Sequence, residues 1–320
     1  RGLSPAAIQA RLEQAPASGQ RNLMDFQTFM QQFVNALSLG SLYALIAIGY
    51  TMVYGILRLI NFAHGDVFMI GGYLAFYAVT AFMMPWWAAV LVAIALTAIF
   101  GMGLERVAYR PLRDSPRISI MISAIGASFL IENLAIVLFD ARPKAFPVPA
   151  FFASTFVLGG VHVSMVSVVI PVVTALFLAA LLWVVYRTKT GMAMRAVSTD
   201  IDAARLMAID VNRIVAFTFA VGSGLAAIGG IMWALKYPRL EPLMGIMPGL
   251  KCFIAAVIGG IGSISGAVLG GLLLGLIELM TIAFLPELTG YKDAFAFVLL
   301  IVVLLVKPTG LLGSKQGEKV

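Results

Sequence analysis

The chain has 320 residues, of which 61% are hydrophobic and only 12% are charged, about half the charged share of an average soluble domain. This composition excludes a soluble globular protein and indicates several membrane-spanning helices. The formal net charge of +7 does not indicate a nucleic-acid binder, because the basic residues lie in short loops between apolar runs. A single cysteine, Cys252, excludes an intrachain disulfide framework.

The first segment, residues 1–23, is polar and rich in Ala, Gln and Pro. It lacks the apolar centre of about 7–15 residues that a signal peptide requires. We expect it to be a disordered tail, with Met24 as the natural start of the chain. The membrane domain should then cover residues 24–313, and a cytoplasmic tail should follow at residues 314–320.

Apolar runs of membrane-spanning length recur along the rest of the sequence. A helix needs roughly 20 such residues to cross the hydrocarbon core, so the runs predict an all-α, polytopic helical bundle with eight or nine crossings. The uncharged stretch 67–104 would be roughly 57 Å long as one helix, so it must break, and residues 83–87 mark the break. The runs lie at about 31–57, 65–84, 86–104, 118–139, 163–186, 214–234, 249–260, 266–285 and 293–307.

The basic residues predict the orientation of the bundle. They cluster in the loops 105–117 and 187–213 and after residue 306, and such clusters mark the cytoplasmic side. The N-terminus then lies outside, and parity requires the run 249–285 to cross twice, with a turn at residues 259–266. If that glycine-rich turn is instead re-entrant, the number of crossings falls to eight.

The loop 187–213 is predicted to contain a short helix on the cytoplasmic side. Thr199 has the character of an N-cap, and an acidic residue follows three positions later, close to a capping box. A short amphipathic helix here would offer a docking surface to a cytoplasmic partner, although any long loop also needs some structure. The residues assigned to this helix are Thr199, Asp200, Asp202, Ala203, Ala204, Arg205 and Leu206.

Asn61, His64 and Asp66 form a polar cluster beside sequence of membrane depth. Ionisable groups in such a position relay protons, bind a metal or contact a zwitterionic substrate. The alternative is helix capping and subunit packing, with Asp66 at the N-terminus of the next helix. A metal site is disfavoured, because the only other histidine, His162, is predicted to lie on the opposite side of the membrane.

Further candidates for a translocation pathway lie within the apolar runs. Glu132 and Glu278 interrupt otherwise apolar helices, so they contact substrate or form a hydrogen bond or ion pair across a subunit interface. Tyr43, Tyr50 and Tyr54 share one helix face at helical spacing. That face either lines a pore or packs against a neighbouring helix.

Five stretches of the sequence together resemble one family. They are GMAMRA at 191–196 with AARLMAIDVNR at 203–213, NALSLGSLYALIAIGYTMVYGI at 35–56, INFAHGDVFMIGGY at 60–73, AVIGGIGSISGA at 256–267 and ERVAYRPLR at 105–113. They are similar to the permease subunits of bacterial ABC importers for branched-chain amino acids. The resemblance covers residues 24–313, and the polar tail has no counterpart in it.

The resemblance implies a multi-pass permease in the bacterial inner membrane and makes the helix in loop 187–213 a coupling helix. It implies four further chains: a second, related permease, two cytoplasmic ATPases and a periplasmic substrate-binding protein. The chain has no phosphate-binding loop of the Gly-x-x-x-x-Gly-Lys-Ser/Thr type, so we expect a non-catalytic subunit without a cofactor. Two alternatives stay open: a urea or short-amide importer of the same class, and a secondary transporter that works alone.

Overall fold

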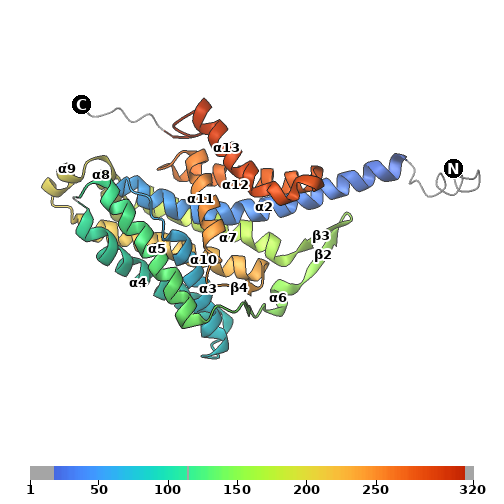
Figure 1. The fold of residues 1–320 in the computed structure, drawn as a ribbon, viewed down its shortest axis with the longest axis horizontal. Helices are drawn as coiled ribbons and strands as arrows, with labels where there is room; N and C mark the ends of the chain where they lie inside the picture. The colour runs from blue at the N-terminus through green and yellow to red at the C-terminus, as the bar shows by residue number, and fades with distance from the viewer. Residues whose placement is uncertain (1–17, 114, 314–320) are drawn as a thin grey trace, which may run out of the picture.

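The computed structural model describes residues 18–113 and 115–313 as a helical bundle (Figure 1). Within these ranges, seven helical spans are long and apolar enough to cross a membrane, which confirms the predicted class of fold. The tail segments 1–17 and 314–320 lie outside the described residues, whereas 18–23 belong to the first helix. The long helices are α2 (Ser18–Leu57), α4 (Trp86–Leu104), α5 (Arg117–Phe139), α7 (Met165–Arg187), α10 (Val211–Lys236), α12 (Ile264–Phe284) and α13 (Lys292–Val306).

Helix α2 is the central element of the bundle. The most apolar part of this helix is 94% buried, and it packs against α12, α10, α11 and α7. The spans of α4, α5, α7 and α13 are mostly exposed in the single chain, with at most 22% of each buried. Apolar surface of this extent is expected on helices that face lipid or another subunit.

Two helices are shorter than the hydrocarbon core is thick. Helix α3 (His64–Thr80) has 17 residues and α11 (Ile246–Gly259) has 14, so at 1.5 Å per residue they measure roughly 26 and 21 Å against about 30 Å of hydrocarbon. The predicted break near residue 83 is confirmed: α3 ends at Thr80 and α4 begins at Trp86. The bundle therefore contains the broken or short helices that the sequence predicts.

The two short helices meet N-terminus to N-terminus at three glycines. A Cβ atom on Gly65 would lie 2.5 Å from the Gly245 carbonyl oxygen, and one on Gly249 would lie 2.9 Å from the Gly65 Cα. These separations leave no room for a side chain. We call this contact of Gly65, Gly245 and Gly249 the half-helix junction.

One end of the bundle carries the small sheets. Strands β2 (Thr155–Leu158) and β3 (Val161–Ser164) form a hairpin whose two turn glycines both have positive φ. Strand β1 (Lys144–Ala145) pairs with β4 (Arg239–Leu240), which joins the loop after α5 to the loop after α10. The four-residue helix α6 (Ala150–Ala153) lies between β1 and β2. By the predicted orientation, this end is the outer one.

The opposite end carries the basic loops. Helices α8 (Lys189–Thr199) and α9 (Ile201–Leu206) lie there, far from the β2–β3 hairpin (Figure 1). The α11–α12 turn is tied to the C-terminal segment, because the backbone N–H groups of Leu311 and Leu312 donate to the carbonyls of Ile258 and Gly259 at 2.8 Å. The glycine-rich turn therefore lies on the same side as the basic C-terminal segment, as the parity argument predicts.

The half-helix junction gives a direct test of the fold. Substituting Gly65→Ala should lower the melting temperature of the purified protein, because overpacking of a tight contact costs about 1–3 kcal/mol. The matched control is Gly126→Ala in α5, where a Cβ would meet nothing within 4 Å and alanine favours the helix. Fluorescence-detected size-exclusion chromatography after heating measures both variants, and equal melting curves for the two would contradict the junction.

Candidate functional site

The half-helix junction places polar groups inside the bundle. His64, the first residue of α3, is 1% exposed and its Nε2 atom has no hydrogen-bond partner. Its ring lies edge-on to Tyr50 at 4.6 Å between centroids. The ring also occupies space left by Gly49 of α2, where a Cβ would lie 2.3 Å from His64 Nε2. The sequence cluster and one of the three tyrosines are thus brought together at this point.

The neighbours of His64 bond to other helices and do not cap their own. The N-terminus of α3 has no side-chain cap, so Asn61 does not cap it, whereas Asp66 does lie in the first turn as the capping alternative predicted. Tyr109 donates to the Asn61 side-chain oxygen at 2.7 Å, and Ser128 of α5 donates to Asp66 at 2.5 Å. Asp66 still benefits from its place in the first turn, where the helix dipole favours a carboxylate.

Glu132 lies close to this cluster. It is half-buried and also interacts with Ser128, so Ser128 lies between the carboxylates of Asp66 and Glu132. The positive ends of two helix dipoles and two carboxylates are therefore gathered near the middle of the bundle. Groups of both signs in one place suit a zwitterionic ligand.

Glu278 belongs to a second buried cluster. Its carboxylate accepts a 2.8 Å hydrogen bond from Tyr43 and pairs with Lys251 at 2.9 Å. Lys251 also pairs with Asp293 at 2.6 Å, so this network joins α2, α11, α12 and the start of α13. Lys292 lies 3.7 Å from Glu278 and completes a set of two positive and two negative charges. Lys251 was not predicted as a site residue, although a lysine inside an apolar run is itself a signal.

The remaining tyrosine of the predicted face, Tyr54, lies nearer the C-terminal end of α2 and lines a cavity there. The three tyrosines thus have three different surroundings. Tyr43 contacts the charge network and Tyr50 contacts the half-helix junction, whereas Tyr54 lies beyond both. Both inner tyrosines lie next to α11, since Tyr50 also contacts Phe253 and the ammonium of Lys251 lies 5.9 Å from the Tyr43 ring.

The loop after α4, cytoplasmic by the predicted orientation, is built around a buried carboxylate. The chain leaves α4 through a π-helical turn, Glu105–Tyr109, and a 3-10 turn, Arg110–Leu112. Glu105 is fully buried and pairs with Arg110 at 2.8 Å and with Arg113 at 2.7 Å. Arg113 also donates to the side chain of Asn212, the second residue of α10, at 2.9 Å. This loop therefore contacts the helix that follows α9.

A short helix, α9, lies where the coupling helix was predicted, but its N-cap is not Thr199. Thr199 is the last residue of α8, where its hydroxyl donates to the Arg195 carbonyl. The extended residue Asp200 caps α9 and accepts from the N–H groups of Asp202 and Ala203 at 3.0 and 3.1 Å. The Asp200 carboxylate carries a full negative charge, which the positive end of the helix dipole favours. It therefore caps α9 in place of the neighbouring Thr199 hydroxyl.

The free end of α9 is apolar and exposed. Leu206 is 88% exposed and Met207 is 77% exposed, whereas Ala204 is buried against the body of the protein. Arg205 pairs with Asp202 on the exposed surface, so the two charged side chains within α9 contact each other. Two neighbouring large apolar side chains in water are typical of a protein contact surface. We call Leu206 and Met207 the α9 tip.

Comparison with known proteins identifies the class. The family model described as "Branched-chain amino acid transport system / permease component" matches residues 32–304, so the chain belongs to that family of membrane permeases. It is 46% identical to the high-affinity branched-chain amino acid transport system permease protein BraD of Pseudomonas aeruginosa, over 91% of this chain and 98% of that protein.

Two further relatives are also similar along nearly their whole length. The high-affinity branched-chain amino acid transport system permease protein LivH of Escherichia coli is 44% identical over 92% of this chain and 99% of that protein. A probable branched-chain amino acid transport permease protein LivH of Methanocaldococcus jannaschii is 26% identical over 87% of this chain and 90% of that protein. Both relatives are described as branched-chain amino acid transport permeases, as the family is.

The charge network gives a testable prediction for stability. Lys251→Met alone should destabilise the protein by roughly 3–5 kcal/mol, because it leaves Glu278 buried without its main partner. The double variant Lys251→Met with Glu278→Gln should recover much of that loss, because no uncompensated charge then remains deep in the bundle. Melting curves of the wild type, both single variants and the double variant measure the coupling. Simple additivity of the two single effects would contradict a mutual ion pair.

Proposed function

We propose that the chain is the permease subunit of an ABC importer that moves branched-chain amino acids across the bacterial inner membrane into the cytoplasm. The observation that carries the proposal is the 46% identity to a branched-chain amino acid permease over 91% of the chain. The proposed assembly contains a second, related permease, two cytoplasmic ATPases and a periplasmic binding protein. The exposed α9 tip and the basic cytoplasmic loops support a partner on that side.

The proposed mechanism is alternating access driven by the ATPases. The α9 tip docks on an ATPase, and movement of α9 displaces the start of α10. A series of contacts leads from there to the half-helix junction: Asn212 to Arg113, Arg113 to Glu105, and Tyr109 of the same π-helical turn to Asn61. Asn61 lies three residues before His64 and four before Gly65. Such a series of polar contacts is a physical route for coupling, and only a functional test establishes it.

Substrate passage is proposed to occur beside the half-helix junction. A zwitterion would meet a prohibitive desolvation cost in bare hydrocarbon. The converging N-termini of α3 and α11 favour its carboxylate, and Asp66 and Glu132 favour its ammonium group. Asn61, His64 and Tyr50 line the same region in this proposal. The contacts need only be weak, because the binding protein captures the substrate and delivers it.

The α9 tip gives the first test of coupling. Leu206→Glu together with Met207→Glu should reduce ATP-driven uptake at least about tenfold, because two charges replace a desolvated apolar contact. The ATPase subunits should also be lost from the purified complex, while the permease still inserts and remains folded. Leu158→Glu, at an exposed position of the outer hairpin, is the matched control and should retain the ATPases. Normal ATPase recovery with the tip variant would contradict docking at α9.

The route to the junction is tested by removing one hydroxyl. Tyr109→Phe deletes the hydrogen bond to Asn61, so the amount of substrate imported per ATP hydrolysed should fall several-fold. Tyr73→Phe is the control, because the Tyr73 hydroxyl is buried without a hydrogen-bond partner and its loss should leave uptake unchanged. Uptake and ATP turnover are measured together in proteoliposomes. If both variants import as much per ATP as the wild type, the Asn61 contact does not transmit the motion.

Reconstitution tests the function itself. Proteoliposomes that contain the complete assembly should accumulate labelled leucine, isoleucine and valine when binding protein and ATP are present. Labelled urea should not accumulate, and liposomes with the permease alone should show no uptake. Urea accumulation would establish the urea alternative, and uptake without ATPases would establish a secondary transporter.

A further inference from the structure

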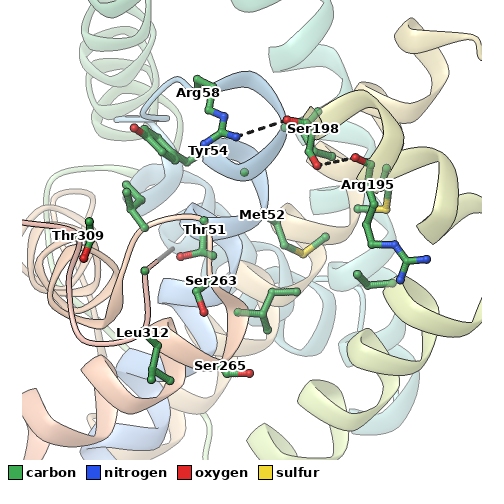
Figure 2. Close-up of a pocket in the computed structure, with 18 of the residues that line it drawn as sticks. Thr51, Met52, Tyr54, Arg58, Arg195, Ser198, Ser263, Ser265, Thr309 and Leu312 are labelled. Atoms are coloured by element: carbon green, nitrogen blue, oxygen red, sulfur yellow. Dashed lines mark hydrogen bonds between the residues drawn. The ribbon is translucent and has the colours of Figure 1, made fainter. Parts of the chain in front are cut away.

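A cavity of about 560 Å³ lies at the cytoplasmic end of the bundle. It lies between the end of α2, the α7–α8 connection, the α11–α12 turn and the C-terminal segment 308–313 (Figure 2). Its volume is within the range of roughly 300–1,000 Å³ that small-molecule sites occupy. The half-helix junction does not line it, so it is a separate site on the cytoplasmic side.

The charged side chains that line this cavity are all positive. They are Arg58, which follows α2, and Arg195 of α8, and no carboxylate is among the lining residues that the structure describes. Neither arginine forms an ion pair with any described residue. Arg58 donates to the Ser198 carbonyl at 3.4 Å, and the Arg195 guanidinium lies 5.3 Å from the Tyr186 ring. Two guanidinium groups without an acidic partner suit a carboxylate ligand.

The backbone at Arg58 is held in an unusual conformation. Its φ is +57°, in the left-handed region where residues other than glycine are uncommon. This conformation ends α2 and lets the Arg58 side chain extend to Ser198 across the cavity (Figure 2). Strain of this kind often accompanies a functional position.

A buried hydroxyl also lacks a partner here. Thr51 lines the cavity and is 1% exposed, and its Oγ1 atom makes no hydrogen bond. Ser263, which also lines the cavity, caps the N-terminus of α12, and Ser265 lies in the first turn of that helix. The first N–H groups of a 21-residue helix favour an anion. An acceptor bound between Thr51 and α12 would satisfy the buried hydroxyl.

Apolar side chains also line part of the cavity. Met52, Ile56, Val185 and Leu312 contribute hydrocarbon surface. A ligand that matches both the arginine side chains and the apolar side chains has one carboxylate and a compact apolar body. This combination fits an aliphatic amino acid better than a phosphate or a sugar, because neither of these has an apolar part for that surface.

We propose that this cavity binds the carboxylate of a small aliphatic amino acid on the cytoplasmic side, through Arg58, Arg195 and Thr51. The inference rests on the proposed function, since the imported substrate is the ligand. Substrate that leaves the half-helix junction occupies the cavity before release, and cytoplasmic amino acid rebinds there at high concentration. Because no acidic side chain of the described residues lines the cavity, recognition depends on the carboxylate and not on the ammonium group.

Binding is measured on the assembled transporter in nanodiscs without binding protein, using labelled leucine and scintillation proximity. Wild type should bind leucine, isovalerate should compete, and leucinol, which lacks the carboxylate, should not. Arg195→Gln and Arg58→Gln should each weaken binding at least about tenfold, the loss typical of one charge-assisted hydrogen bond. Thr51→Val should weaken it about threefold. Arg187→Gln is the matched control, because Arg187 is exposed at the same end of the bundle but does not line the cavity.

Each contrary outcome has a definite meaning. Competition by leucinol equal to that by leucine, or equal binding by the Arg195→Gln and Arg187→Gln variants, overturns the proposal. Competition by glycerol 1-phosphate without binding of leucine identifies a lipid headgroup site and also overturns it. If the wild-type assembly takes up leucine but shows no carboxylate-dependent binding, the proposal for the cavity is overturned and the proposed transport function is not. Binding of leucine without uptake of any branched-chain amino acid defeats the proposed function and leaves the cavity standing.

Discussion

The architecture depends on the contact between the starts of α3 and α11 at Gly65, Gly245 and Gly249. Each helix is too short to cross the hydrocarbon core, so each can hold its place only by packing against the rest of the bundle. Head-to-head contact between them is possible because three residues lack a side chain. As a result, two positive helix ends and a set of polar side chains lie within an otherwise apolar protein.

The two buried clusters have complementary effects on these helices. Asn61 and Asp66 join the start of α3 to the π-helical turn after α4 and to α5. Lys251 joins α11 to α12 and α13 through Glu278 and Asp293. A buried ion pair contributes little net stability, but breaking it is costly, so it favours one arrangement over its alternatives. Both short helices are thereby fixed at their sides, while the contact between them consists of backbone and small residues only.

Helix positions could be predicted from the sequence, because hydropathy alone determines where a chain crosses lipid. Thus the expected run 86–104 and helix α4 coincide, and the expected break falls between Thr80 and Trp86. The junction could not be predicted, because Gly65 and Gly245 are far apart in the chain and glycine is common in all membrane helices. The ion pair of Lys251 with Asp293 could not be predicted either, because these two residues are also far apart in the sequence. The choice of Asp200 over Thr199 as N-cap depends on one residue's backbone conformation, which no local pattern specifies.

The sequence-predicted cluster of Asn61, His64 and Asp66 is assembled by the structure, and Tyr50 joins it. Glu278 and Tyr43 belong to the other cluster, and Tyr54 belongs to the cytoplasmic cavity. The three tyrosines on this face of α2 therefore belong to three different sites at successive depths in the bundle. The spacing of these tyrosines places them in one set, because spacing determines which face of α2 they share but not what packs against that face.

We propose that the half-helix junction opens when substrate passes beside it, and Cys252 tests this opening most directly. It is the only cysteine in the chain, is fully buried, and lies in α11 one turn beyond Gly249. The rate at which a small methanethiosulfonate reagent modifies Cys252, followed by mass spectrometry of its peptide in the native assembly, reports this opening. We predict that the rate rises at least about tenfold when binding protein, substrate and ATP are present together. An unchanged rate during active uptake would contradict the account.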